Sequence, residues 1–414
     1  MRWLAMPWLD VQRGRHTSSL ARMDIDFQTG TLLLLIAAVV AMLTKRLRLP
    51  YSVGLVAAGF CLAALPFAPT IKLTKDFLFT ALLPPLLFDS AFHLHWDWLR
   101  RNTLVIGALA TLGVVLSGSV TAAGMHYVMG WQWMDALIFG ALIAATDPVS
   151  VIATFKEAGL HGRLLVLVEA ESLFNDGTAA VAFGVVAALA AGQQLAPAQI
   201  GLMLGQTIGG GVLCGAAVAV SSLVLMGRTD DHLVEITFTT VAAYGSFLLA
   251  DHFGLSGVLA TITAGLVMSN LKSLDGISRR GKEAIHTFWE YAGFVATSMV
   301  FLLIGIQQSH HNFLAVWLPT ACAIAFVLLG RAVSVYGCCA MFSRSPLRVS
   351  ARHQHILFWG GLRGALALAL ALSLPAHLPM REEIITISFG VVAFTIFVQG
   401  LTMTPFLRRM GEIG

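Results

Sequence analysis

Acidic side chains lie inside long apolar segments of this 414-residue chain. Asp147 stands in AATDPVSV, and Glu169, Glu171 and Asp176 stand in VEAESLFNDGTA. A charged group near the centre of a membrane span costs about 2.5–3.5 kcal/mol, so such groups are rare and mostly functional. Carboxylate and hydroxyl oxygens are ligands of hard cations, and these two motifs contain neither imidazole nor thiolate. They therefore favour binding of a hard cation over binding of zinc or copper.

Helical spacing divides the second motif into two faces. Glu169, Ser172 and Asp176 are three or four residues apart and share one face, whereas Glu171 and Asn175 form a neighbouring stripe. Burial near a second acid favours the protonated form of a carboxyl group. We therefore expect Asp176 to bind either a proton or a cation, with each expelling the other.

The elements that carry these residues should be broken helices. Pro148 directly follows Asp147, and a proline removes a backbone hydrogen bond, so the helix should open there and turn carbonyls and the Thr146 hydroxyl toward a cation. The sequence Gly360-Gly361-Leu362-Arg363-Gly364 is a second weak point, because glycines permit unwinding inside a protein.

Composition indicates an all-α polytopic membrane protein. The chain is 57% hydrophobic and 12% charged, whereas soluble proteins are about 25% charged. Scattered basic residues exclude a nucleic-acid partner. Apolar stretches near the roughly 20 residues that a bilayer requires predict about thirteen transmembrane helices, at residues 27–44, 50–70, 76–95, 103–128, 134–155, 164–191, 199–227, 233–251, 255–271, 287–306, 313–342, 354–376 and 384–407.

Charge in the loops predicts the orientation. Most Lys and Arg residues follow odd-numbered spans, and the opposite connections hold only Lys72, Lys75 and Arg381. By the positive-inside rule the N-terminus is outside and the C-terminus cytoplasmic, in a multi-pass protein of the cell inner membrane. Spans 5 and 12 then have opposite orientations, so spans 4–6 and 11–13 are expected to be inverted repeats with two crossing discontinuous helices.

Two terminal segments flank the transmembrane domain of residues 27–407. Residues 1–26 form an N-terminal extension whose arginines contradict the orientation, so we expect the true start to be Met23. An extension lying on the membrane surface is the alternative. Residues 408–414 are predicted to be a short cytoplasmic tail without a regulatory role.

These motifs in combination resemble the NhaP-type monovalent cation:proton antiporters, from about residue 32 to 407. The resemblance rests on Asp89 after a double proline, Thr146-Asp147-Pro148, Glu171-Ser172, Asn175-Asp176, the glycine-rich segment 360–364 and Gln399-Gly400-Leu401-Thr402. It implies a sodium/proton antiporter-like fold and a homodimer. Spans 4–6 and 11–13 would form a core that moves like an elevator, and the remaining spans would serve mainly in dimerisation.

The resemblance also implies the site. Sodium would bind at Asp147, Ser172 and Asp176, with Asp176 as the main carrier and with Thr146 and Asp89 nearby. Among supporting residues, Glu171 would pair with Arg331, Asn175 would orient the site, and Arg363 would support the unwound segment. Asp89 replaces the usual glutamate of relatives and is one methylene shorter, which puts its contact with the ion in doubt. No cofactor is implied, and the partners would be a second copy, membrane lipids, monovalent cations and protons.

Other interpretations stay open. One titratable group in Asn175-Asp176 predicts electroneutral one-for-one exchange of sodium or lithium for protons. A potassium/proton antiporter of the same fold, a cation channel and an intramembrane hydrolase built on Ser256 and His252 are alternatives. Purely structural roles are also open: Asp147 as a turn residue, Glu169 as a partner of the helix dipole, and Arg331 and Arg363 as counter-charges.

Among these interpretations we predict a transporter and not an enzyme.

Overall fold

The computed structural model describes residues 27–413 except 48, 65–73, 95, 148, 150, 153–154, 156–159, 161, 194–195, 271–278, 309–312, 314 and 377. Within these residues every regular element is helical. By length and composition, 8 helices can cross a membrane, and four shorter apolar helices accompany them. The predicted all-α polytopic class is confirmed. The predictions about residues 1–26 and about Lys72 lie outside the described residues.

The helices follow the apolar segments of the sequence. The first half of the chain forms α2 (Phe27–Leu47), α3 (Tyr51–Ala63), the π-helix η1 (Phe77–Leu82), α4 (Leu83–His93), α5 (Trp96–Ala110), α6 (Leu112–Met129), α7 (Trp133–Ile143) and α9 (Arg163–Ala190). The second half forms α10 (Pro197–Met226), α11 (His232–His252), α12 (Gly257–Asn270), α13 (Arg279–Gln308), α14 (Trp317–Met341), α15 (Ala351–Trp359), α16 (Ala365–Leu372), α17 (Arg381–Phe394), the π-helix η3 (Thr395–Gly400) and α18 (Leu401–Met410).

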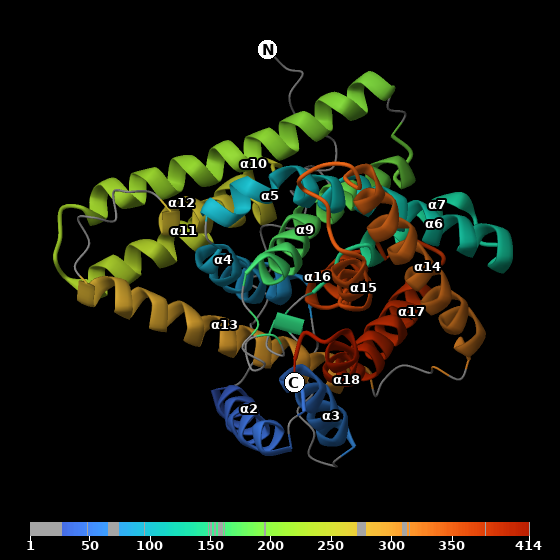
Figure 1. Ribbon diagram of the computed structural model, residues 1–414, viewed down its shortest axis with the longest axis horizontal. Coiled ribbons are helices and arrows are strands. Elements are labelled where there is room, and N and C mark those ends of the chain that lie inside the picture. The colour runs from blue at the N-terminus through green and yellow to red at the C-terminus, as the bar shows by residue number, and fades with distance from the viewer. Residues whose placement is uncertain are drawn as a thin grey trace.

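Packing sorts most of these helices into two groups (Figure 1). In one group α6 packs on α14 and α7, α9 packs on α5 and α7, and α16 packs on α17. In the other group α13 packs on α3 and α4, and α10, α11 and α12 pack on one another. The groups meet where α9 contacts α4, α10 and α12. Helix α9 therefore connects the two halves of the fold.

Small residues explain how closely the helices approach within each group. A Cβ added at Gly140 of α7 would lie 2.3 Å from the Gly118 carbonyl oxygen of α6. A Cβ at Gly215 of α10 would lie 2.1 Å from the Ala260 carbonyl oxygen of α12. Lipid supplies no hydrophobic drive between apolar helices, so membrane bundles gain stability from such close van der Waals contact. These glycines fix which helices become neighbours.

Two predicted spans are broken where the sequence indicated. Span 134–155 is helical to Ile143, non-helical from Ala145 to Asp147, and helical again at Val149, Val151, Ile152 and Phe155, while Pro148 itself lies outside the described residues. Span 354–376 is divided into α15 and α16 by the non-helical residues 361–364. Asp147 N–H donates to the Leu362 carbonyl at 2.8 Å, so the two breaks are joined directly. The expected pair of discontinuous helices is present, and their breaks lie side by side.

Two other helices differ from their predicted spans. The fourth span was expected to begin at residue 103, but the helix begins at Trp96 and is interrupted at Thr111. Its first turns carry the exposed residues Arg100 and Arg101, so the helix continues beyond the apolar segment that hydropathy detects. The last span, expected as one helix, contains the π-helix η3 between α17 and α18.

Candidate functional site

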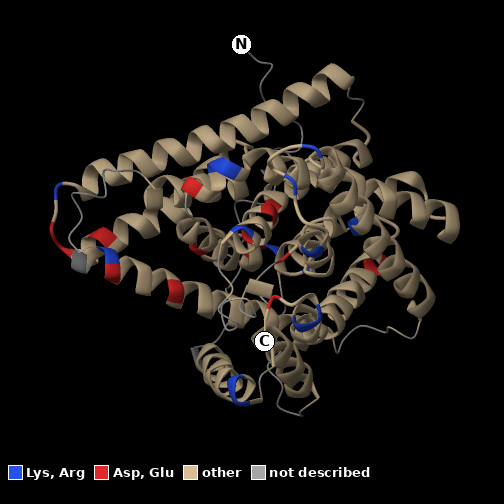
Figure 2. Cartoon of the chain, in the orientation of Figure 1, with Lys and Arg blue, Asp and Glu red and all other residues tan. Residues whose placement is uncertain are grey.

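Charged residues are few along the helices (Figure 2), and the buried ones include Glu169, Glu171, Arg331 and Arg363. A cavity of about 50 Å³ is lined by α4, the break after α7, α9 and the start of α16. A water needs roughly 10–15 Å³ of such volume, so the cavity holds a few waters or one small cation. Its polar wall consists of Ser90, Thr146, Asp147, Glu169 and Asp176.

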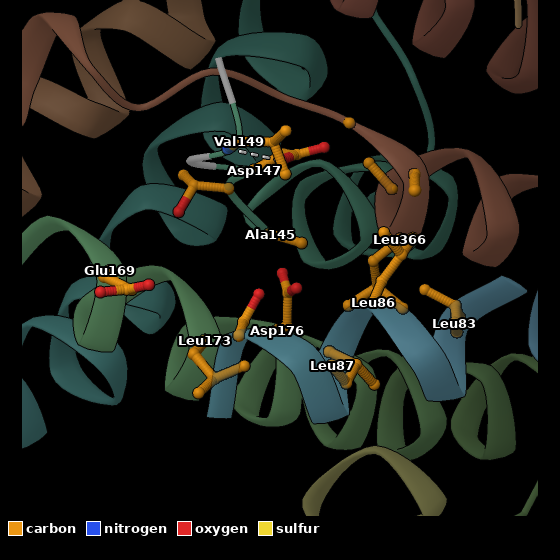
Figure 3. A pocket seen from close by; sticks show the side chains of 15 residues that line it. Leu83, Leu86, Leu87, Ala145, Asp147, Val149, Glu169, Leu173, Asp176 and Leu366 are labelled. Atoms are coloured by element: carbon orange, nitrogen blue, oxygen red, sulfur yellow. Dashed lines mark hydrogen bonds between the residues drawn. The ribbon is translucent and has the colours of Figure 1, made fainter. Parts of the chain in front are cut away.

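Asp147 and Asp176 occupy opposite sides of this cavity (Figure 3). Asp147 Oδ1 accepts a hydrogen bond of 3.0 Å from Val149 N–H. Asp176 projects into the space from α9, and no hydrogen-bond or ion-pair partner for its carboxylate occurs among the residues that the structure describes. Of the three carboxylates that line the cavity, Asp147 accepts a backbone hydrogen bond and Asp176 faces open space; the third is Glu169.

Glycine at position 364 makes room for Asp147. A Cβ at Gly364 would lie 1.9 Å from Asp147 Oδ2, far inside any permitted contact. The neighbouring Gly361 does the same for another charge, because its Cβ would lie 2.5 Å from Arg331 Nε. The glycine-rich segment 360–364 thus receives charged side chains from two other elements, in addition to being unwound.

Thr146 and Ser172 hold the opened segment against α9. Ser172 Oγ donates to the Thr146 carbonyl, and the two hydroxyls lie 3.0 Å apart. Asn175 Nδ2 donates to Thr146 Oγ1 at 3.2 Å. Ser172 does not line the cavity, although Thr146 does. In this conformation Ser172 positions the unwound chain and leaves the cavity to its neighbours.

Glu171 and Arg331 form the ion pair that the resemblance implied. Arg331 Nη1 and Nη2 donate to Glu171 Oε1 and Oε2 at 2.7 and 3.0 Å, and Nη2 also donates to the Leu357 carbonyl at 2.9 Å. Both side chains are buried. The pair ties α9 to α14 and to the end of α15, one turn before the break.

Arg363 lies within the break itself and is 1% exposed. Its Nη1 donates to the Gly361 carbonyl at 2.6 Å, and its backbone N–H donates to Thr395 Oγ1 at 3.1 Å. Thr395 belongs to the π-helix η3, whose Gln399 donates to the Trp359 carbonyl at 3.1 Å. The irregular turn in the last span therefore supports the unwound segment, as π-turns near functional sites often do.

Asp89 is placed differently from the other predicted residues. It does not line the cavity, and its Oδ1 lies 3.1 Å from His93 Nδ1. Ser90 lines the cavity instead, together with Leu83, Leu86 and Leu87. These positions follow the i, i+3, i+4, i+7 spacing of one helix face, and Asp89 is off that face. The same helical rule that separated Glu171 from Asp176 on α9 would have identified Ser90 from sequence.

Ser256, the candidate nucleophile of the hydrolase alternative, has a structural contact. Its Oγ accepts a hydrogen bond of 3.2 Å from Leu259 N–H at the start of α12, and the residue is buried. His252 is exposed at the end of α11. The arrangement is that of a helix cap, and it gives no support to an activated serine.

Comparison with known proteins agrees with this architecture. Residues 32–409 match the family model described as sodium/hydrogen exchanger, transmembrane. The chain is 38% identical over 369 residues to the Na(+)/H(+) antiporter ApNhaP of Aphanothece halophytica, covering 89% of this chain and 71% of that protein. It is 35% identical to the Na(+)/H(+) antiporter NhaG of Bacillus atrophaeus, covering 93% and 75%.

A solved structure shares the fold. The sodium proton antiporter MjNhaP1 from Methanocaldococcus jannaschii, determined at pH 8, superimposes with a TM-score of 0.74 and covers 92% of this chain and 97% of its own. The two sequences are 19% identical. The similarity at this identity concerns the arrangement of helices.

Proposed function

Because this chain belongs to the sodium/hydrogen exchanger family, we propose that it exchanges sodium for protons at the cavity between Asp147 and Asp176. Sodium/proton antiport is the activity that membership in this family and the names of the relatives support. The observation that supports this choice of site is that Asp147 and Asp176 face one small cavity, where Asp176 has no hydrogen-bond or ion-pair partner among the residues that the structure describes.

In this proposal a proton and a sodium ion compete for the carboxylate of Asp176. An unpaired carboxylate in an apolar interior is costly in its charged form, so it binds either a proton or a cation. Sodium would be coordinated by Asp176, Asp147 and the oxygens of Thr146, with Ser172 joining if its hydroxyl turns from the Thr146 carbonyl. Protonation of Asp176 would remove the negative charge that holds the ion. A core that crosses only when loaded then couples one gradient to the other.

We infer an elevator-like movement from the packing. The group containing α6, α7, α14, α16 and α17 carries both breaks, and the Asp147–Leu362 hydrogen bond joins them. The group containing α3, α4 and α10 to α13 would be the scaffold and, with its exposed apolar residues on α10 such as Leu202 and Leu213, would supply the surface for a homodimer. We propose the cell inner membrane as the location, with the N-terminus outside and the C-terminus in the cytoplasm.

Electroneutral one-for-one exchange follows from the neutral Asn175 beside Asp176. Asn175 donates to Thr146 and to Glu171 Oε1, the latter at 3.3 Å, so it acts as a hydrogen-bond donor and carries no proton. Under this proposal one carboxylate trades one proton for one cation. Potassium/proton exchange remains the alternative substrate pairing, since cavity volume alone does not distinguish the two ions.

The test is proton movement in proteoliposomes that contain the purified protein and an acidic interior. Addition of external sodium should dissipate the pH gradient, lithium should do the same, and potassium should not. A clamped membrane voltage should leave the rate unchanged. A rate that changes with voltage would contradict electroneutrality, and a response to potassium alone would establish the alternative pairing. Flux far above carrier rates would indicate a channel.

A further inference from the structure

A second cavity, of about 270 Å³, lies between α4, α10, α11, α12 and α13 and shares no lining residue with the first. Two histidines from different helices form part of its wall. His93 Nε2 and His286 Nε2 are 3.0 Å apart, and their rings are nearly perpendicular at 88°. The sequence places them 193 residues apart, so packing of α4 against α13 creates the pair.

The surroundings of His93 determine which of its nitrogens carries the proton. Its Nδ1 lies 2.8 Å from the Asp89 carbonyl oxygen and 3.1 Å from Asp89 Oδ1. The Asp89 carbonyl oxygen is an acceptor, so Nδ1 is the protonated nitrogen and donates to it, and Nε2 of the neutral ring accepts the hydrogen bond from His286 Nε2. A metal ion would replace that shared proton, with the His286 proton moving to its own Nδ1. A histidine whose far nitrogen donates to a backbone carbonyl is a usual arrangement of a metal ligand, because the acceptor fixes the tautomer and orients the ring.

We propose that His93 and His286 form a two-histidine site for a transition-metal ion of the Zn²⁺ or Ni²⁺ type. Two nitrogens that each lie about 2.0–2.1 Å from zinc at a tetrahedral angle are about 3.3 Å apart. The observed 3.0 Å separation needs a change of only a few tenths of an ångström. Neutral imidazole is the preferred protein ligand of these ions.

Water from the cavity completes the coordination. Among the described residues no group of three or more His, Cys, Asp and Glu is close enough to hold a metal, so the protein supplies two nitrogens and a carboxylate behind one of them. The cavity wall adds the hydroxyl-bearing residues Thr239 and Ser269. Lys282 also lines the cavity and is exposed; its positive charge weakens cation binding. The site is therefore weaker than a closed structural zinc site.

Metal binding would connect α4 to α13. Helix α4 also forms the wall of the first cavity through Leu83, Leu86, Leu87 and Ser90, and His93 is three residues beyond Ser90. A bound ion would restrain α4 where it faces Asp176 and would slow exchange. This second step rests on the proposed function, whereas the binding step does not.

Binding is measured by isothermal titration calorimetry on purified protein from which any histidine tag has been removed, using zinc chloride and nickel chloride at pH 7.5. We expect one saturable site per chain. His286→Ala should weaken binding at least tenfold, and Asp89→Asn should weaken it several-fold. His252→Ala is the matched control, because His252 is exposed on α11 and should leave affinity unchanged. Equal affinities for His286→Ala and the wild type would overturn the site.

A further measurement tests the effect of binding on exchange. In proteoliposomes, zinc should slow sodium-driven proton movement by the wild type and not by His286→Ala. Binding without slowing would overturn the restraint on α4, and absence of exchange in both proteins would count against the proposed function alone.

Discussion

Two carboxylates on α9, five positions apart, have opposite environments. Glu171 is 2% exposed and makes a bidentate contact with Arg331 at 2.7 and 3.0 Å, supported by Asn175. Asp176 faces a cavity across from Asp147 and has no partner of its own among the described residues. One helix therefore carries a carboxylate that is paired with an arginine, Glu171, and a second carboxylate that faces the cavity, Asp176.

The contrast shows how a membrane protein divides its buried charges between structure and transport. A buried carboxylate with a bidentate arginine keeps its charge, since removing either partner leaves an uncompensated ion and costs about 3–5 kcal/mol. A carboxylate without such a partner must find one from outside the protein, and a proton or a cation serves. Under the proposed function, the Glu171–Arg331 pair holds α9 in place while Asp176 exchanges a proton for a cation.

The largest expected effect is that of Asp176→Asn. The substitution preserves shape and removes the exchangeable charge, so sodium-driven proton movement should fall to the level of empty vesicles while thermal stability in detergent stays within a few degrees. Glu290→Gln, an exposed position on α13, is the matched control and should transport normally. Exchange retained in Asp176→Asn would place the carrier elsewhere.

Gly364→Ala should be nearly as damaging. The added methyl group would meet Asp147 Oδ2 at 1.9 Å, so Asp147 must leave its place opposite Asp176, and we expect exchange to fall at least tenfold. Gly337→Ala provides the comparison, because nothing lies within 4 Å of a Cβ there and alanine favours the helix. Rates are compared at equal amounts of reconstituted protein. Similar rates for the two variants would contradict the role of the close approach.

Breaking the Glu171–Arg331 ion pair should lower the stability of the fold more than it lowers the exchange rate. Arg331→Leu leaves Glu171 buried and unpaired, which should cost about 3–5 kcal/mol and lower the thermal unfolding temperature. The double variant Glu171→Leu with Arg331→Leu removes both charges and should recover a large part of that loss. Thermal melts of the three proteins check this. A double variant less stable than the single one would show that the pair contributes beyond charge compensation.

The smallest effect concerns Ser90 and Asp89. Ser90→Ala removes a cavity hydroxyl, and the loss of one polar contact to the bound, partly hydrated cation, of about 1 kcal/mol, should raise the KM for sodium roughly fivefold at unchanged maximal rate. Asp89→Asn should leave this KM unaltered, since Asp89 lies outside the cavity. Sodium dependence of exchange in proteoliposomes measures both. A KM for sodium that rises in Asp89→Asn and not in Ser90→Ala would show that Asp89 contacts the ion and Ser90 does not.

Sequence was sufficient for the features that local rules determine. Hydropathy located most of the apolar helices, Pro148 and the glycines of 360–364 predicted the breaks, and helical spacing assigned Glu171 and Asp176 to different faces. Applied to α4, the same spacing selects Ser90. The interruption at Thr111 and the π-helix η3 were not predicted, because neither has a distinctive local signal.

Contacts between distant segments could not be read from the chain. Three such contacts depend on how the helices pack. Arg331 donates to the Leu357 carbonyl, and Asp147 N–H donates to the Leu362 carbonyl. Charged side chains also occupy the space beside Gly361 and Gly364. A glycine in the sequence indicates flexibility or close approach without identifying the neighbour. The structure supplies that neighbour.

The close fit of Asp147 against Gly364 also constrains the order in which these two positions can change over evolutionary time. A side chain at position 364 is incompatible with the present carboxylate at 147, since the two would occupy the same space. If position 364 changes first, the new side chain collides with Asp147. If position 147 changes first, the intermediate loses the cation ligand that we propose there. Both orders of single change are therefore disfavoured, and the two positions are expected to change together or not at all.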